Sequence, residues 1–403
     1  MKVKRIGGVR DAAHELWSDG RGWILVGVAS GWFLSLGVRL IFPALLPAIR
    51  ETFEINLMVL GLLVTVLWTA YALGQFPGGI VGDWFGEGNA LVVSTVCSGI
   101  AIAAVAVSAT PMMLFVATAV FGFSTALFGP ARFTILSAIY KDRDGTAVGI
   151  TLSAGEAGNA LLPVVAGLLA GTLSWRAGFG ITVPLFFLVT VLISRTIPGQ
   201  VSTATDEYSF SVEMFREVID GIADRLVLLI SSVHLTLFFV YQGFTGFYPT
   251  YLVEIKGMSP VVAAMFFGWF FVVGIAVQPI SGAGGDRFGY RPVLLVVSGV
   301  SAVVLLAVPF ADALVSLLLV TTGASVLLGS TPLTQTYLVN ELPAHVKGTG
   351  LGLLRTGYIA LGATGPLFVG TVAEWGYFNE SFFGLAAVAG LGLLLTVLLP
   401  EGP

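Results

Sequence analysis

The sequence predicts an all-α, polytopic membrane protein with twelve transmembrane helices in two parallel six-helix repeats. Composition is the first indication: of 403 residues, 56% are hydrophobic and only 10% are charged, whereas soluble domains carry about 25% charged residues. The second indication is a series of apolar runs that are long enough to cross a bilayer. The third is a set of glycine, proline and polar residues that recurs at one fixed offset along the chain.

Twelve apolar runs account for the predicted spans. A helix needs about 20 apolar residues to cross the hydrocarbon core of a bilayer. Most connections between the runs are only a few residues long, so neighbouring spans must be antiparallel, and an even number of spans places both termini on one side. The predicted spans are 23–49, 57–81, 89–109, 111–139, 146–171, 176–197, 226–252, 260–284, 292–310, 312–339, 348–373 and 380–399.

Lysine and arginine are unevenly divided between the two sides of the predicted membrane. The side that holds the N-terminal tail and the central linker has thirteen of them, whereas the opposite side has three, which are Arg50, Arg176 and Lys256. Cytoplasmic segments of membrane proteins are enriched in these residues. We therefore expect a multi-pass protein of the plasma membrane with both termini in the cytoplasm.

A shift of 203 residues superimposes one half of the chain on the other. Gln75 then meets Gln278, Pro163 meets Pro366, and several glycines coincide. So many matches at one offset indicate that the two halves are copies of one unit. Apolar residues at helical spacing in the linker predict an amphipathic helix on the cytoplasmic membrane surface. The predicted division is an N-terminal half at 1–197, the linker at 198–225 and a C-terminal half at 226–403.

One loop sequence occurs in both halves. The fragment GAGGDRFGYR contains Gly282, Asp286, Arg287, Gly289 and Arg291, and GIVGDWFGEG contains Gly79, Asp83 and Gly86. The second copy matches the pattern G-x-x-x-D-(R/K)-x-G-(R/K)-(R/K) well, whereas the first departs from it, with Trp84, Glu87 and Gly88 in place of basic residues. The copies fall between spans 2 and 3 and between spans 8 and 9. With the twelve spans and the central linker, this pattern resembles the major facilitator superfamily of secondary transporters.

The resemblance implies alternating access, in which two halves rock about a central site lined by spans 1, 4, 7 and 10. Glycine in the loop motif permits a tight turn, and we expect each aspartate to cap the following helix and to form a latch between helices. Because the first copy lacks its basic residues, Asp83 is predicted to pair with Arg132 or Arg355. The second latch would place Asp286 near Gly145. The alternative is a polar turn without a gating role.

Ionisable side chains within the spans are candidates for the functional site. A charge near the bilayer centre costs about 2.5–3.5 kcal/mol on insertion scales. This chain has five such candidates, which are Arg39, Arg132, Arg355, Glu156 and His234. The excess of positive charge favours an anionic ligand, because a guanidinium matches carboxylate and oxyanion geometry. The repeat places Gln242 opposite Arg39, so the halves differ at this position, which favours substrate binding over a structural ion pair.

Several of these residues admit two interpretations. Arg132 could bind substrate or could replace the basic residues missing beside Asp83. Glu156 could carry a coupling proton or could be a fixed counter-ion to an arginine. His234 could titrate near neutral pH, but a single histidine is more often a hydrogen-bonded bystander. Further hydrogen bonds to a substrate could come from Tyr241, Gln242, Gln335 and Tyr358.

The expected function is secondary active transport of a small organic anion with proton coupling, that is, symport. The alternative is a proton-driven exporter of lipophilic compounds, although Leu162-Pro163 stands in span 5 where some exporters of the family carry Gly-Pro. An enzyme is not expected, because the chain has neither an H-E-x-x-H zinc motif nor a P-loop. We expect no cofactor, no metal and no nucleic acid partner. The expected form is a monomer in the lipid bilayer, with a small-molecule substrate and protons as its partners.

Overall fold

The computed structural model describes residues 16–17, 20–141, 143–199, 221–342 and 347–400, without the side chains of Phe76, Asp83 and residues 347–349. Within these ranges all regular secondary structure is helical. Twelve helical segments are long and apolar enough to cross a membrane, which confirms the predicted number of spans. The predicted linker helix falls largely outside the described residues.

The observed helices begin and end within a few residues of the predicted spans. The first six spans are α2 (Arg21–Phe53), α3 (Leu57–Phe85), α4 (Glu87–Ala106), α5 (Pro111–Ala126) with α6 (Phe128–Ile139), α7 (Asp144–Thr172), and α8 (Trp175–Gly180) with α9 (Thr182–Thr196). The other six are α11 (Arg225–Glu254), α12 (Pro260–Phe288), α13 (Tyr290–Ala307) with η2 (Val308–Phe310), α14 (Leu314–Ala324) with η3 (Ser325–Gly329) and α15 (Ser330–Glu341), α16 (Lys347–Gly362) with α17 (Gly365–Glu374), and α18 (Phe378–Val397).

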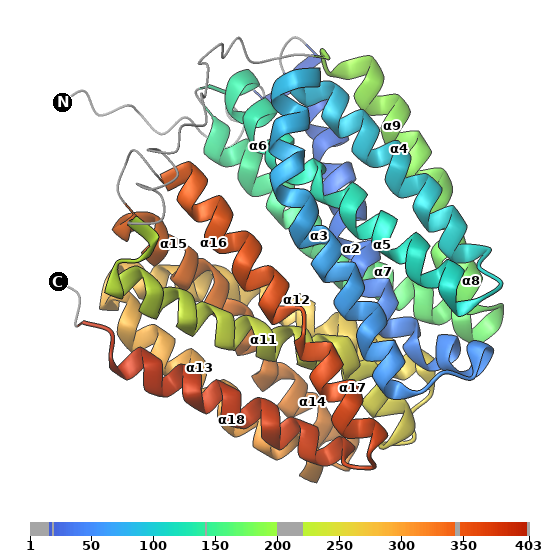
Figure 1. The fold of residues 1–403 in the computed structure, drawn as a ribbon, viewed down its shortest axis with the longest axis vertical. Coiled ribbons are helices and arrows are strands. Elements are labelled where there is room, and N and C mark those ends of the chain that lie inside the picture. The colour runs from blue at the N-terminus through green and yellow to red at the C-terminus, as the bar shows by residue number, and fades with distance from the viewer. Residues whose placement is uncertain (1–15, 18–19, 142, 200–220, 343–346, 401–403) are drawn as a thin grey trace.

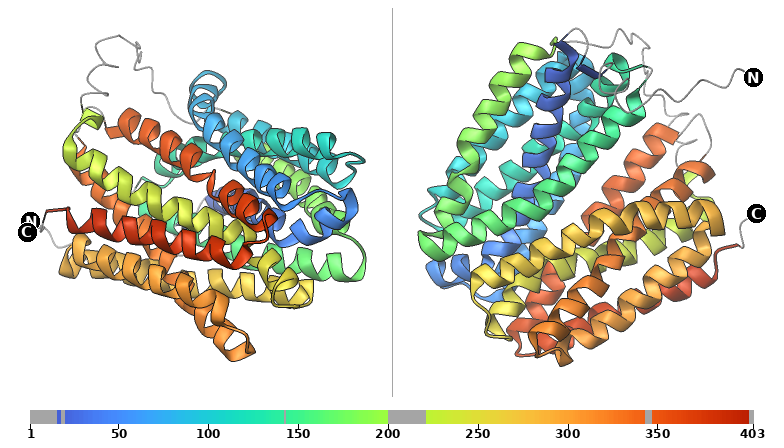
Figure 2. Two further views of the ribbon diagram at one scale, coloured as in Figure 1. Left: turned by 60° about the horizontal axis from the view of Figure 1, so that its bottom comes forward. Right: turned by 180° about the vertical axis from the view of Figure 1, so that it is seen from behind.

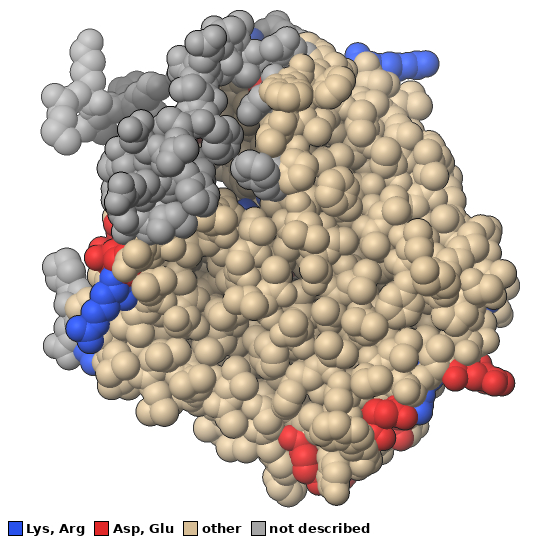
Figure 3. All heavy atoms as spheres, in the orientation of Figure 1, with Lys and Arg blue, Asp and Glu red and all other residues tan. Residues whose placement is uncertain are grey.

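Two helix bundles lie side by side, one built from α2 to α9 and the other from α11 to α18 (Figures 1 and 2). In the view of Figure 3 the middle of the molecule shows no Lys, Arg, Asp or Glu, and these side chains appear at the ends of the helices. A surface that faces lipid must be uncharged in this way, because the hydrocarbon core does not solvate charge.

The two bundles repeat the same local geometry at the offset of 203 residues. The helices α3 and α12 both contain 29 residues. Asn56 caps the start of α3 and Ser259 caps the start of α12, each with a side-chain oxygen that accepts a hydrogen bond from an amide of the first turn. Gly86 (φ 85°) and Gly289 (φ 89°) then turn the chain into the next span. A residue with a Cβ would be strained at these φ values, which explains why glycine stands in both copies.

The aspartates of the loop motif do not cap the following helices, contrary to the prediction. Asp83 and Asp286 lie in the last turns of α3 and α12. The N-caps of α4 and α13 are Gly86 and Gly289, and neither makes a side-chain capping bond. The prediction was wrong because α3 and α12 continue past their apolar runs. The side chain of Asp83 lies outside the described part of the structure, so its pairing with an arginine stays a prediction.

The two bundles join at the membrane face opposite the loop motif, which we call the closed face. Arg50, near the end of α2, forms a 2.6 Å ion pair with Glu254 at the end of α11. Glu374, at the end of α17, accepts a 2.7 Å hydrogen bond from the backbone N–H of Leu57 at the start of α3. The negative carboxylate of Glu374 also suits the positive end of the α3 dipole. Two polar contacts therefore tie the bundles together at this face.

Glycines show where the bundles touch and where they part. At the closed face, a Cβ on Gly61 would lie 2.5 Å from the carbonyl oxygen of Pro366, and one on Gly167 would lie 2.5 Å from the Cβ of Ala264. Each of these contacts joins the two bundles. The face that carries the loop motif, which we call the motif face, is different. A Cβ would meet no atom within 4 Å at Gly79, Gly82, Gly145, Gly149, Gly282 and Gly352. The glycine contacts between the bundles thus lie toward the closed face, and the described helices of the two bundles diverge toward the motif face (Figure 1).

Removing the charge of Glu374 is expected to loosen the closed face. Glu374→Gln weakens a charge-assisted helix cap that is worth about 1 kcal/mol, which corresponds to about a fivefold change in an equilibrium constant. Thr65 is a suitable reporter, because its hydroxyl donates a 2.7 Å bond to the carbonyl of Ala363 across the two bundles. In a Thr65→Cys background, Glu374→Gln should raise the rate of maleimide labelling about fivefold.

The matched control for this prediction is Glu380→Gln, since Glu380 lies in the first turn of α18 and is exposed. It should leave the labelling rate unchanged. Equal labelling in the Glu374 and Glu380 variants would show that the Glu374 contact does not hold the closed face together.

Candidate functional site

Arg39 lies in the middle of α2 and is 1% exposed. Trp32, Ser35 and Arg39 are spaced three and four residues apart, so they share one face of the helix. The Nε of Arg39 donates a 2.8 Å hydrogen bond to the carbonyl oxygen of Ser35. Its guanidinium carbon lies 3.9 Å from the ring centroid of Tyr71 and 5.1 Å from that of Trp68, both on α3. Aromatic faces therefore surround this cation.

Arg132 lies in the first turns of α6 and is 2% exposed. Its guanidinium carbon is 3.4 Å from the ring centroid of Trp32, and the guanidinium carbon of Arg39 is 5.7 Å from the ring centroid of the same residue. Trp32 therefore brings the two cations together. This position beside Arg39 favours the interpretation of Arg132 as part of the central site.

The arginines have donors without acceptors. Arg39 Nη1, Arg132 Nε and Nη1, and Arg355 Nε are buried and make no hydrogen bond. No ion pair joins these three residues to a carboxylate among the described side chains. A cation–π contact contributes about 2 kcal/mol when desolvated, whereas burying an ion costs several kcal/mol. The aromatic rings thus offset only part of the cost of burying this charge.

The second bundle contributes a polar cluster around Arg355 of α16. Gln335 Nε2 of α15 donates a 3.4 Å bond to the hydroxyl of Tyr358, and the ring of His234 packs edge-on against Tyr358 at 4.1 Å between centroids. Arg355 lies within electrostatic range of His234, Tyr358 and also Tyr71 of the first bundle. Arg355 and Gln335 are half-buried, so this side of the cluster remains accessible.

His234 is held by a hydrogen bond to Thr334. Its Nδ1 lies 2.6 Å from Thr334 Oγ1, and that hydroxyl lies 2.8 Å from the carbonyl oxygen of Ser330. Either the ring or the hydroxyl can be the donor of the bond between His234 and Thr334, depending on the tautomer of His234. This arrangement favours the interpretation of His234 as a hydrogen-bonded bystander that supports Tyr358.

Glu156 lies on α7 beside amide side chains. Asn159 Nδ2 donates a 3.3 Å bond to Glu156 Oε2, and Gln278 of α12 also contacts the carboxyl. Tyr241 of α11 lies within electrostatic range of both Glu156 and Arg39. No described arginine forms an ion pair with Glu156. Both interpretations of Glu156, as a proton carrier and as a counter-ion to an arginine, stay predictions.

The structure therefore brings most of the predicted site residues into one cluster. Gln242 lies next to Tyr241 in α11 and is buried, with no hydrogen-bond partner for its Nε2. Three aromatic residues of the cluster, Trp32, Trp68 and Tyr71, were not predicted. Tyr71 precedes Gln75 by four residues, so the two share one face of α3, which is the one signal in the sequence that could have found it.

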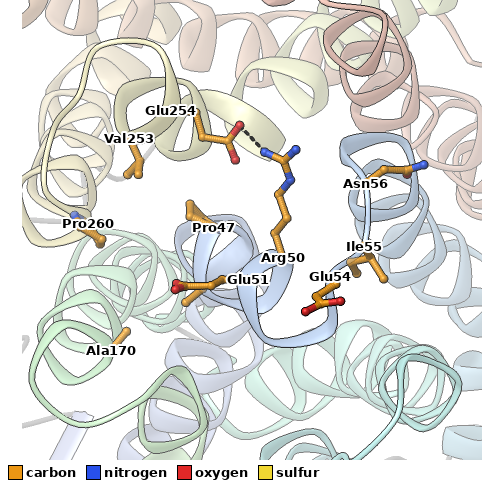
Figure 4. A pocket seen from close by; sticks show the side chains of 11 residues that line it. Pro47, Arg50, Glu51, Glu54, Ile55, Asn56, Ala170, Val253, Glu254 and Pro260 are labelled. Atoms are coloured by element: carbon orange, nitrogen blue, oxygen red, sulfur yellow. Dashed lines mark hydrogen bonds and ion pairs between the residues drawn. The ribbon is translucent and has the colours of Figure 1, made fainter.

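A separate cavity of about 810 Å³ lies at the closed face. Figure 4 shows Arg50 and Glu254 pointing toward one another across it, with Glu51 and Glu54 alongside. Arg50 is eleven residues beyond Arg39 on α2, which is roughly 16 Å at 1.5 Å per residue. This cavity is therefore a vestibule between the ends of the spans and is not part of the arginine cluster.

Comparison with known proteins identifies the family. The family model of the Major Facilitator Superfamily matches residues 28–363 and residues 230–403. The chain belongs to the major facilitator superfamily. Members of this family are transporters and not enzymes, so the protein is a multi-pass membrane transporter. The family explains the twelve spans, the repeated halves and the paired loop motifs.

Two curated relatives of the transporter differ in how much of the chain they match. A protein of Cupriavidus necator described as a probable sulfoacetate transporter is 23% identical over 91% of this chain and 90% of its own length. A multidrug efflux pump of Mycolicibacterium smegmatis is 26% identical over 44% of this chain and 36% of its own length. The similarity to the first relative thus covers both halves.

Solved transporter structures share the fold. A bacterial homolog of the human lysosomal transporter Spinster, in an inward-facing and unoccupied conformation, has a TM-score of 0.79 with 15% identity and covers 95% of this chain and 97% of its own. A D-xylose–proton symporter has a TM-score of 0.75 with 16% identity and covers 94% of this chain and 98% of its own. These similarities establish the architecture of this transporter.

Proposed function

We propose that this transporter is a proton-coupled symporter that moves a small organic anion across the membrane by alternating access. The observation that carries the proposal is the buried pair Arg39 and Arg132, whose free donors have no carboxylate partner among the described residues. An anion supplies the missing acceptor and counter-charge, and guanidinium donors match a carboxylate or sulfonate group. The full-length similarity to a probable sulfoacetate transporter supports the same substrate class.

The other cluster residues complete the proposed site. Tyr241, Gln242, Gln335 and Tyr358 supply hydrogen bonds to the substrate, and Arg355 supplies positive charge from the second bundle. Glu156 is the proposed proton carrier, because its neighbours Asn159 and Gln278 are neutral amides and can accommodate either the charged or the neutral carboxyl.

The proposed orientation places both termini and the motif face in the cytoplasm of a cell whose plasma membrane holds the protein. The excess of Lys and Arg on that side supports this assignment. In this orientation the described conformation is open toward the cytoplasm, because the two bundles are joined at the closed face and diverge toward the motif face.

Cysteine labelling of intact cells tests the orientation. Glu54, at the closed face, and Lys141, after α6 at the motif face, are both exposed. In a Cys97→Ser background, an impermeant maleimide should react with the Glu54→Cys variant in intact cells and with the Lys141→Cys variant only after permeabilisation. The reverse pattern would invert the assignment.

Transport by the purified protein in proteoliposomes tests the function itself. A proton gradient directed into the proteoliposomes, with the outside more acidic, should drive accumulation of one or more labelled organic anions. The panel includes sulfoacetate, acetate and succinate. A lipophilic cation such as tetraphenylphosphonium should not be moved. Movement of that cation with no transport of any anion would overturn the proposal and favour the exporter, which the partial similarity to a multidrug efflux pump supports.

A further inference from the structure

We infer that the substrate is a dianion whose two acidic groups are held separately by the two bundles, one at Arg39 and Arg132 and the other at Arg355. This inference rests on the proposed function and narrows it from organic anions in general to molecules with two acidic groups.

The first bundle provides unpaired donors for one acidic group. Arg39 and Arg132 contact the ring of Trp32 at 5.7 Å and 3.4 Å, so their guanidinium carbons cannot be further apart than the sum of these distances. Three of their donor nitrogens, Arg39 Nη1 and Arg132 Nε and Nη1, have no acceptor. One carboxylate or sulfonate has enough lone pairs to accept hydrogen bonds from all three.

The second bundle provides a separate positive group. Arg355 Nε is buried and has no acceptor. Arg355 precedes Tyr358 by three residues on α16, and both residues lie within electrostatic range of Tyr71 in the first bundle. Arg355 also lies within electrostatic range of both Arg39 and Arg132. Arg355 belongs to the other bundle. An acidic group bound at Arg39 and Arg132 therefore leaves Arg355 without a counter-charge.

Charge balance in the cluster favours two negative charges on the ligand. The described cluster contains three arginines and one carboxylate, Glu156, which leaves two positive charges when Glu156 is ionised and three when it carries the coupling proton. A monoanion neutralises only one of them. The remaining charge would stay partly buried, and an uncompensated buried charge is strongly unfavourable.

Two-point binding also explains how the substrate could drive closure of the motif face. A ligand shifts a conformational equilibrium only by its difference in affinity for the two states. Without a ligand, Arg355 repels the arginines of the first bundle and opposes approach of the bundles. A dianion replaces this repulsion with two attractions, whereas a monoanion satisfies only the first bundle.

Matched pairs of substrates test this inference in the reconstituted wild-type protein. Succinate and succinamate have nearly the same shape, but the second carries an amide in place of one carboxylate. At about pH 7.5, counterflow should be at least about tenfold faster for succinate than for succinamate, because the neutral amide cannot replace the charge-assisted hydrogen bonds of the second carboxylate. Counterflow of sulfoacetate, a dianion, should likewise be faster than counterflow of acetate, a monoanion.

The variant Arg355→Gln links the preference to its proposed cause. It should reduce the ratio of dianion to monoanion transport to about one, whatever its absolute rates, and Arg355→Lys should keep part of the preference because the charge remains. Thermal unfolding of each variant checks folding, and the wild-type ratio tests the inference even if a variant does not fold.

The outcomes separate this inference from the proposed function. Equal transport of succinate and succinamate, or an unchanged ratio in folded Arg355→Gln, would overturn the dianion inference and leave anion transport in place. Failure of every anion on the panel would overturn both.

Discussion

Arg39→Gln is expected to reduce anion transport by about 30-fold or more. Truncating one member of a buried, hydrogen-bonded charge pair costs about 2–5 kcal/mol, and Arg39 is the most buried cation of the cluster at 1% exposure. Arg39→Lys should restore transport only in part, because lysine supplies a point charge without the planar fork. Initial rates of counterflow in proteoliposomes measure both variants.

The matched control for Arg39 is Arg176→Gln. Arg176 also lies over an aromatic ring, with its guanidinium carbon 4.4 Å from the ring centroid of Trp175, and it donates a 2.9 Å bond to the carbonyl of Ser108. It lies outside the cluster and should not be needed for transport. A wild-type rate in Arg39→Gln would assign Arg39 a structural role within its aromatic surroundings and remove the main support for an anionic substrate.

Glu156→Gln is expected to abolish accumulation driven by a pH gradient while leaving exchange of substrate at about its normal rate. Glutamine fills the same space and can still hydrogen-bond to Asn159 and Gln278, but it cannot take up a proton. Loaded proteoliposomes with and without an imposed pH gradient distinguish the two activities. The result would show that coupling and binding reside in different residues of the cluster.

A second carboxylate provides the comparison for Glu156. Glu380→Gln, at the exposed start of α18, should retain full accumulation. If Glu156→Gln also accumulates substrate at the normal level, another group carries the proton. Loss of both accumulation and exchange would instead place Glu156 in substrate binding.

The sequence by itself determined the architecture of this transporter. Apolar runs of about 20 residues dictate twelve spans because the bilayer excludes unpaired backbone groups and charge. The offset of 203 residues predicted the repeat, and the structure places Gly86 and Gly289 in the same backbone conformation. Rare charges within apolar runs also singled out Arg39, Arg132 and Arg355, because such residues are costly in a membrane.

Only the tertiary structure decided which residues meet. Apolar periodicity and spacing are local properties, whereas the rotation and tilt of each helix depend on packing against spans that are far away in the sequence. Nothing local to Trp32 predicted that its ring would lie near both Arg39 and Arg132. The ion pair of Arg50 with Glu254 joins residues 204 positions apart. Three-dimensional packing also set where the helices end, and for this reason Asp286 lies in the last turn of α12 and does not cap the next helix.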